Sequence, residues 1–303
     1  MISKAIVEAL QKIVPQENIL LQEPMAGHTT FRIGGPADCF VQPENEEQLR
    51  RLQHYLNQVE IPWFILGNGS NLLVSDRGFS GVVIQIGQKM KNITVDGCKL
   101  TVQAGATMAQ AARAALEYGL TGLEFASGIP GTVGGGVVMN AGAYGGEMSQ
   151  VTEQVVVLDR DGERMELDND TMEFGYRTST IKNHPFVVTE VVFRLEPGDR
   201  EQMKQKMDEL AVRRRGKQPL EYPSAGSTFK RPEGYFAGQL IMEAGLRGFQ
   251  IGGAKVSDKH CGFIINTGNA TARDVRDVIC KVQEQVKEQF HINLETEILF
   301  LGF

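Results

Sequence analysis

Two glycine-rich loops are the first residues that suggest chemistry. Residues 67–71 read GNGSN directly after a short apolar run, and residues 128–136 read GIPGTVGGG. Because glycine lets the main chain approach a ligand closely, such loops can turn successive N–H groups toward an anion. Two loops of this kind suit a pyrophosphate and therefore a dinucleotide. Two tight structural turns explain the glycines equally well.

Four other side chains have the right types to act on a substrate. Arg177, in FGYRTS, carries a permanent charge that can fork onto a carboxylate. Ser227, in AGSTFK, carries a hydroxyl, which in a free serine is a very weak acid. Glu295 and Glu297 lie two residues apart on one expected strand face, so the pattern does not choose between them. The ordinary alternatives are a surface ion pair for the arginine and a turn for the serine.

The usual nucleotide-binding and hydrolase signatures are missing. Gly67-Asn68-Gly69 continues to Leu72 instead of glycine, and the Gly-Lys pair before Gln218 lacks the Ser or Thr of a P-loop. Neither G-x-S-x-G nor H-E-x-x-H occurs, and the histidines and cysteines lack metal-ligand spacing. We therefore expect no metal site, and a Rossmann dehydrogenase, a P-loop NTPase and an α/β-hydrolase lose support.

Regular elements are expected around these motifs. Apolar spacing predicts helices at residues 2–14, 46–57, 107–118, 200–215 and 237–244, and one that starts at Thr271. Apolar and alternating runs predict strands at residues 63–66, 81–86, 100–104, 155–158, 165–167, 187–195, 262–266 and 293–301. Residues 126–146 are rich in glycine and show no helical period. The mixture predicts an α+β protein.

Composition limits the class of protein. The chain has 303 residues, of which 42% are hydrophobic and 22% charged, as in a soluble globular protein of about two domains. Its net charge of −6 weighs against nucleic-acid partners. No apolar run is long enough for a membrane helix, and the N-terminus lacks the pattern of a signal peptide. We expect a cytoplasmic protein with small-molecule partners; monomer is a plausible state, although the sequence does not determine it.

The order of the motifs resembles one family of flavoenzymes. A strand followed by GNGSN and later by GIPGTVGG is similar to the PCMH-type FAD-binding domain of the vanillyl-alcohol-oxidase superfamily. Within that superfamily the chain resembles the UDP-N-acetylenolpyruvoylglucosamine reductases, the MurB family. Further matching segments are TTFRIGGPA (29–37), MNAGAYG (139–145), GYRTS (175–179), AGSTFK (225–230), GGA (252–254) and LETE (294–297).

The resemblance implies a domain order. Residues 21–196 would form the FAD-binding domain, with two α+β subdomains at about 21–87 and 88–196. Residues 197–303 would form a C-terminal α+β substrate-binding domain, and residues 1–20 would add an N-terminal helix. The length suggests the shorter, type II-like form of the family, which lacks an extra tyrosine-bearing loop and an inserted βαββ unit.

The resemblance also implies a reaction. NADPH-dependent, FAD-mediated reduction would convert UDP-N-acetyl-enolpyruvoylglucosamine to UDP-N-acetylmuramate, a precursor of peptidoglycan needed for cell-wall synthesis and cell division. Hydride would pass from flavin N5 to the vinyl carbon, Arg177 and Glu297 would stabilise the enolate, and Ser227 would protonate the other carbon. Glu297 is thereby selected over Glu295, and it must be protonated to donate a hydrogen bond to the substrate carboxylate.

The implied FAD contacts lie in the glycine loops and the segment that follows the second one. They are Gly67, Asn68, Gly69, Ser70, Asn71, Gly128, Ile129, Pro130, Gly131, Thr132, Gly134, Gly135, Asn140, Gly142, Ala143 and Tyr144. Asn68 stands where many relatives carry glycine, which a cradle of main-chain amides tolerates. Residues 60–72 contain no histidine or cysteine to tether a flavin, so FAD is expected to be non-covalent.

The implied substrate contacts are Tyr176, Lys230 and one residue of the basic run 213–217. From that run we single out Arg215 as the contact to the UDP diphosphate. A solvated helix end, stabilised by the helix dipole, explains the run equally well.

Two other functions remain open at this point. A flavin oxidase on the same FAD domain would act on a different substrate, and it would react with oxygen at catalytic rates. A nucleotide-binding protein without chemistry would purify without yellow colour. Fold analogy does not separate these possibilities, because function resides in the site.

Overall fold

The computed structural model describes residues 2–303, which form two compact units. The first unit contains the chain up to Leu21 together with Cys39–Asn68 and Gly81–Arg214. The second unit contains Gln22–Asp38, Gly69–Ser80 and Arg215–Phe303. Residue 1, which the predicted N-terminal segment 1–20 includes, lies outside the described residues. The domains predicted at 21–196 and 197–303 remain a prediction.

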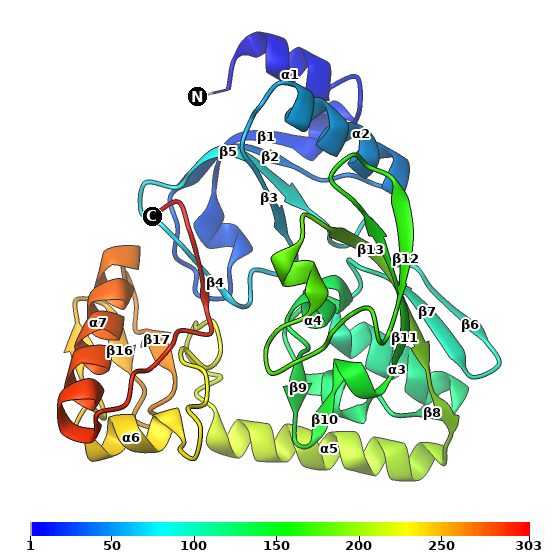
Figure 1. Cartoon of the computed structure of the whole chain (residues 1–303). Helices are drawn as coiled ribbons and strands as arrows, with labels where there is room; N and C mark the ends of the chain where they lie inside the picture. The colour runs from blue at the N-terminus through cyan, green and yellow to red at the C-terminus, as the bar shows by residue number, and fades with distance from the viewer. Residues whose placement is uncertain (1) are drawn as a thin grey trace. The chain divides into compact units, whose positions relative to one another are not determined.

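Figure 1 labels most of the helices and strands. The α-helices are α1 (Lys4–Leu10), α2 (Glu46–Gln58), α3 (Met108–Tyr118), α4 (Val133–Val138), α5 (Arg200–Lys217), α6 (Ala237–Glu243) and α7 (Ala272–Phe290). The strands are β1 (Ile19–Pro24), β2 (Pro36–Val41), β3 (Trp63–Leu66), β4 (Leu72–Val74), β5 (Phe79–Gln85), β6 (Ile93–Asp96), β7 (Lys99–Gln103), β8 (Leu120–Thr121), β9 (Gly142–Ala143), β10 (Gly146–Glu147), β11 (Thr152–Leu158), β12 (Arg164–Asp168), β13 (Val187–Arg194), β14 (Glu196–Pro197), β15 (Gln250–Ile251), β16 (Ala254–Val256), β17 (Ile264–Asn266) and β18 (Leu299–Leu301). Between residues 2 and 303, none of the helices has the length and apolar character needed to cross a bilayer.

A five-stranded antiparallel sheet is the largest sheet of the first unit. Its order is β12-β11-β13-β7-β6, and α3 and α4 contact it and each other (Figure 1). Val155, Val157 and Phe193 are fully buried, as expected for inward positions of half-buried strands. The strands predicted at 155–158, 165–167 and 187–195 are confirmed as β11, β12 and β13.

A second sheet leads into the first glycine loop. Its order is β1-β2-β5-β3, and β3 pairs in parallel with β5. Leu49, Leu52 and Leu56 of α2 belong to the same buried core as Val82 and Ile84 of β5. The loop GNGSN begins directly at the carboxyl end of β3, an edge where ligand-binding loops commonly lie in sheets with parallel pairs.

Local sequence explains the ends of α3. Thr107 caps its first turn in a capping box with Gln110, and Gly119 ends it in the left-handed conformation at φ +68°. Ala111, Ala112 and Ala115 are buried on one side, so the alanine-rich predicted helix at 107–118 is confirmed with its boundaries almost unchanged.

The short helix α4 was not expected. Its sequence, VGGGVV, has three glycines in a row, each of which costs about 1 kcal/mol in a helix interior. Thr132 caps the helix by accepting a hydrogen bond from the Gly135 N–H at 3.3 Å, and Val133 and Val137 are fully buried. Tertiary packing therefore overrides the poor helix propensity of these residues.

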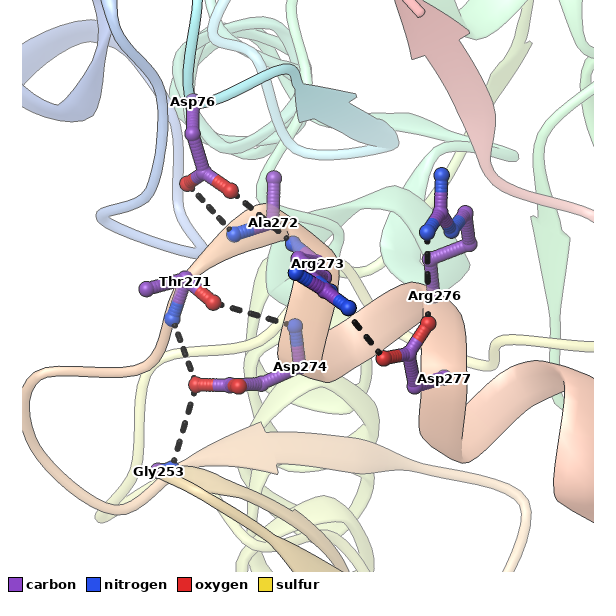
Figure 2. A network of polar contacts seen from close by, with 8 residues as sticks. All are labelled: Asp76, Gly253, Thr271, Ala272, Arg273, Asp274, Arg276 and Asp277. Carbon is purple, nitrogen blue, oxygen red and sulfur yellow. Dashed lines mark hydrogen bonds and ion pairs between the residues drawn. The ribbon is translucent and has the colours of Figure 1, made fainter.

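The second unit packs α6 and α7 with the antiparallel sheet β15-β16-β17. As predicted, α7 begins after Thr271 with a capping box to Asp274, and its apolar face is buried at Val275, Val278 and Val282. Figure 2 shows that Asp76, from the segment after β4, also accepts hydrogen bonds from the first two N–H groups of α7.

The C-terminal strand is shorter than predicted. Only Leu299–Leu301 forms β18, which pairs in parallel with β4, whereas the sequence predicts a strand over 293–301. The preceding residues instead make single pairings, including a bridge between Thr296 and Phe229. Glu295 and Glu297 therefore lie just outside the regular strand.

Candidate active site

Within the first unit, the start of the first glycine loop, Gly67 and Asn68, lies against the second glycine loop. The Asn68 side chain donates a hydrogen bond to the Pro130 carbonyl at 3.1 Å. A Cβ atom on Gly67 would overlap the hydroxyl of Thr132, so only glycine allows this approach. The side-chain amide of Gln85 in β5 donates to the Gly67 carbonyl at 3.2 Å. Gly67 and Asn68 are thus fixed against the second loop and β5.

The first loop offers main-chain donors. Within residues 2–303, the N–H groups of residues 68–71 donate to no protein acceptor, although this stretch is buried or half-buried. The second loop differs, because Val133 and Gly134 donate to the carbonyls of Ala106 and Ala104 at 2.8 and 2.9 Å. Buried amides without acceptors are costly unless a ligand or water bonds to them. Residues 68–71 therefore fit an anionic group such as a cofactor phosphate.

The glycines of the second loop divide into two kinds. A Cβ on Gly134 would lie 2.9 Å from the Cβ of Ala104, and one on Gly136 would lie 2.8 Å from the sulfur of Met108. These two glycines let α4 pack closely on the sheet and α3. A Cβ on Gly135 would meet only the capping hydroxyl of Thr132, at 3.4 Å, so this position is open.

Gly69 is required by the backbone of the second unit. Its φ is +58°, and a Cβ there would overlap the carbonyl of His28. The Gly69 carbonyl accepts a hydrogen bond from the Thr30 N–H at 3.2 Å. The TTFRIGGPA segment therefore fixes the position of Gly69 in the middle of the GNGSN loop. This contact gives the TTFRIGGPA segment a structural role.

Arg177 lies in a tight turn of the first unit. Gly175 and Thr178 pair with each other around Tyr176 and Arg177, and Arg177 has a left-handed φ of +57°. The guanidinium donates to the Gly142 carbonyl at 3.2 Å and lies 5.3 Å from the centre of the Tyr176 ring, which is about half exposed. A left-handed arginine is strained, and such strain clusters at functional sites.

The segment 140–147 lies beside this turn. Gly142 and Ala143 form β9, which pairs with β10, and Tyr144 is 41% exposed with a left-handed φ of +55°. Asn140 is buried, and both polar atoms of its side chain bond inside the protein. Its side chain therefore has a structural task in this arrangement.

Sequence reasoning missed Arg214. Its guanidinium donates to the carbonyl of Gly128, and a Cβ on Gly128 would lie 3.2 Å from its Cδ. Burial lowers the pKa of Arg214, and the neighbouring Tyr144 opposes that shift. Arg215 is exposed, and its carbonyl accepts a hydrogen bond from Lys259 at 2.7 Å. The basic residues 213–217 mark this part of α5 in the sequence. Which of them contacts the second glycine loop depends on the orientation of the helix.

Ser227 and Glu297 lie on adjoining segments of the second unit. Ser227 bridges to Phe263, and the next residue, Thr228, accepts a hydrogen bond from the Glu297 N–H at 2.8 Å. The Asn71 side chain donates to the Glu297 carbonyl at 3.1 Å. The end of the first glycine loop, the serine segment and the glutamate segment are therefore neighbours.

Lys230 distinguishes the two glutamates. Its ammonium group lies 2.9 Å from a carboxylate oxygen of Glu295, whose side chain is 73% exposed. The hydrogen bond from Lys230 lowers the pKa of Glu295. Glu295 therefore acts as a charged surface partner of Lys230, and Glu297 is half-buried next to the serine segment.

The structure groups the predicted residues by unit. The first unit holds Arg177 with Tyr176, residues 128–135 and residues 140–144. The second unit holds Ser227, Lys230 and Glu297 with Gly69, Ser70 and Asn71.

Comparisons with known proteins match both parts of the chain. Residues 37–168 match an FAD binding domain. Residues 218–301 match the C-terminal domain of UDP-N-acetylenolpyruvoylglucosamine reductase. The chain is 51% identical over 300 residues to the UDP-N-acetylenolpyruvoylglucosamine reductase of Caldanaerobacter subterraneus, covering 99% of both chains. It is 52% identical over 287 residues to that of Clostridium perfringens, covering 95% of this chain and 94% of the relative.

Solved structures give the same picture of the fold. The reductase (MurB) from Thermus caldophilus aligns with a TM-score of 0.80 and 36% identity, covering 94% of this chain and 98% of that one. An alkyldihydroxyacetonephosphate synthase aligns over 65% of this chain and 41% of its own, with a TM-score of 0.50 and 18% identity. At that identity the likeness concerns the fold alone.

Proposed function

The chain belongs to the family of UDP-N-acetylenolpyruvoylglucosamine reductases, and on this premise we propose which of its residues carry the reaction. It is a flavin-dependent oxidoreductase that binds FAD, takes hydride from NADPH and reduces UDP-N-acetyl-enolpyruvoylglucosamine to UDP-N-acetylmuramate for peptidoglycan. The expected α+β architecture, with an FAD-binding domain and a reductase C-terminal domain, is confirmed. The alternative of an oxidase acting on another substrate finds no support.

FAD, when bound, carries the hydride that ends on the vinyl carbon of the substrate. We propose that the N–H groups of residues 68–71 hold a phosphate of FAD and that Gly128 to Thr132, Gly135 and Gly142 to Tyr144 line the rest of the cradle. The absence of protein acceptors for those amides supports this assignment. Gly67 and Gly134 contribute by allowing close packing, and Arg214 fixes the carbonyl of Gly128.

Three side chains complete the reaction in this proposal. Arg177 stabilises the negative charge that spreads onto the substrate carboxylate, because its guanidinium offers paired donors. Ser227 gives its hydroxyl proton to the carbon that bears the carboxylate, and solvent replaces that proton. Glu297, in its protonated form, donates a hydrogen bond to the same carboxylate.

Substrate contacts are proposed at three further residues. Tyr176 is exposed beside Arg177, Lys230 follows the serine segment, and Arg215 is the candidate for the diphosphate. We propose the shorter family form and a cytoplasmic location without membrane partners, with monomer as a plausible state. The net charge of −6 supports the absence of nucleic-acid partners.

The observation that supports the catalytic assignment most strongly is the meeting of the Asn71, Ser227 and Glu297 segments. An anaerobic absorbance experiment in two steps tests it. One equivalent of NADPH should bleach the bound flavin, and the enolpyruvyl substrate should then restore the oxidised spectrum. In Ser227→Ala and Glu297→Ala only the second step should slow. Slowing of both steps, or of the first alone, would refute the assignment.

A further inference from the structure

Asn140 has an uncommon conformation for a residue that does not contact solvent. Its φ is +39°, in the left-handed region, and it is 1% exposed. Asparagine tolerates this region better than most residues, but holding it there still costs free energy. A strained, buried polar residue next to a proposed active site requires a reason in its contacts.

The side chain of Asn140 connects two backbone segments. Its Nδ2 donates to the Gly175 carbonyl at 3.0 Å, at the start of the turn that presents Arg177. Its Oδ1 accepts from the Ser149 N–H, also at 3.0 Å. Two residues further on, the Gly142 carbonyl accepts the hydrogen bond from the Arg177 guanidinium. Asn140 thus fixes Gly175, at the start of the turn, relative to the Gly142 carbonyl that accepts the hydrogen bond from Arg177.

A second buried side chain holds the other end of the turn. Ser179, 1% exposed, donates from its hydroxyl to the Val138 carbonyl at 3.0 Å. Val138 is the last residue of α4, two positions before Asn140. The turn of residues 175–178 is therefore attached at both ends to the C-terminal end of α4 and the two residues after it.

We infer that Asn140 is a positioning residue, which sets the orientation in which the Arg177 guanidinium meets the substrate carboxylate. Each side-chain polar atom of Asn140 makes a hydrogen bond inside the protein, and the residue is 1% exposed, so its contacts support a positioning role. A preorganised cation stabilises a developing charge more effectively than a mobile one. The inference rests on the role proposed for Arg177.

Two substitutions distinguish the effect of the Asn140 side chain from the effect of its strained backbone. Asn140→Gly removes both hydrogen bonds, and glycine adopts the left-handed φ without strain. Asn140→Asp keeps an acceptor for the Ser149 N–H but replaces the donor to Gly175. Asn169→Ala is a matched control, because Asn169 also donates to two carbonyls, those of Ser149 and Thr152, without touching the turn.

The two half-reactions provide the readout in the FAD-loaded enzyme. Both Asn140 variants should reoxidise with the enolpyruvyl substrate about 10–100-fold more slowly, the cost of a small misplacement of a catalytic group. Their FAD content and their rate of reduction by NADPH should match the wild type. Asn169→Ala should change neither half-reaction. In an Arg177→Ala background, Asn140→Gly should cost little more, because the group it positions is gone.

Other outcomes separate the possible failures. Loss of FAD or slow reduction by NADPH in both Asn140 variants, with Asn169→Ala unaffected, would make Asn140 a cofactor contact and overturn the inference. Wild-type reoxidation in Asn140→Gly would overturn it while leaving Arg177 in place. Wild-type reoxidation in Arg177→Ala would instead refute the proposed role of Arg177, and the inference with it.

Discussion

At the scale of single residues, main-chain pairing decides which side chains of the second unit can act together. Ser227 and Glu297 are 70 positions apart, but the hydrogen bond from the Glu297 N–H to Thr228 makes their segments neighbours. Glu295, two residues earlier, is exposed and paired with Lys230. Glu295 is exposed to solvent, whereas Glu297 is half-buried beside the serine segment, and this difference in burial supports the proposed choice of Glu297.

Replacing Ser227 should affect one half-reaction. Ser227→Ala removes the proposed proton donor, so reoxidation of the reduced flavin by substrate should fall about 10²–10⁴-fold. Reduction by NADPH should be unchanged, as stopped-flow absorbance can measure. Ser224→Ala, in the same loop, is the control. The Ser224 carbonyl accepts a hydrogen bond from the Thr30 hydroxyl, and alanine keeps that carbonyl. Equal loss in both half-reactions would contradict the proposed role.

Replacing Arg214 should weaken cofactor binding. The bond from its guanidinium to Gly128 is charge-assisted, and such bonds contribute about 1.5–3 kcal/mol. Arg214→Ala should therefore raise the Kd for FAD roughly tenfold or more, measured by titrating apoprotein with FAD. Arg213→Ala removes an exposed charge from the same helix and should leave the Kd unchanged. The same Kd in both variants would exclude a special role for Arg214.

At the scale of elements, the N-terminus of α7 shows how a helix end is stabilised from outside its own sequence. Thr271 and Asp274 form the local capping box, and Asp76 accepts from the Ala272 and Arg273 N–H groups at 2.7 and 3.0 Å (Figure 2). The carboxylate also lies at the positive end of the helix dipole. This contact joins the segment after β4 to α7 within the second unit.

Loss of this contact should destabilise the protein measurably. Asp76→Ala leaves two helix N–H groups without a carboxylate, so the free energy of unfolding should fall by roughly 1 kcal/mol, as for a lost cap. Urea denaturation measures the change. Asp277→Ala is the control, because its ion pairs with Arg273 and Arg276 are exposed and contribute little. An equal effect of both substitutions would mean that general charge, rather than capping, matters.

The capping box should make α7 sensitive to acid. The Thr271 N–H, and secondarily the Gly253 N–H, lower the pKa of Asp274 below its ordinary value. The stabilisation is then present above the unfolded pKa of about 3.9 and is lost as the pH falls through the folded pKa. Asp274→Asn should therefore lower stability at pH 7, and the difference from wild type should shrink below about pH 4. A difference independent of pH would show that ionisation of Asp274 is irrelevant.

At the scale of the whole molecule, the bound cofactor should add stability. FAD binds the folded chain and not the unfolded one, so at 100 times Kd it adds about 2.7 kcal/mol. For units of this size the midpoint temperature should rise by about 5–10 °C over the apoprotein. Riboflavin, which lacks the diphosphate proposed to meet residues 68–71, should raise it much less. Equal shifts with the two ligands would contradict the phosphate assignment.

The sequence by itself determined the family, the cofactor and the approximate ends of several helices, including α2, α3, α5 and α6. The capping box and the terminal glycine of α3 lie within residues 107–119, and the periodic valines of α7 predict its buried face. Such signals are local, because caps and periodicity act over one or two turns. The order of the glycine and serine motifs along the chain was enough to indicate a flavin reductase, because recognising it requires no knowledge of which residues meet in space.

Only the tertiary structure decided what each glycine and each charged residue does. Gly134 packs against Ala104, thirty positions earlier, and this packing permits a helix that local propensity disfavours. Arg214, rather than Arg215, reaches Gly128 because of the direction in which α5 presents it. These outcomes depend on atoms from distant segments meeting within a few ångströms, and neither residue type nor spacing along the chain contains that information.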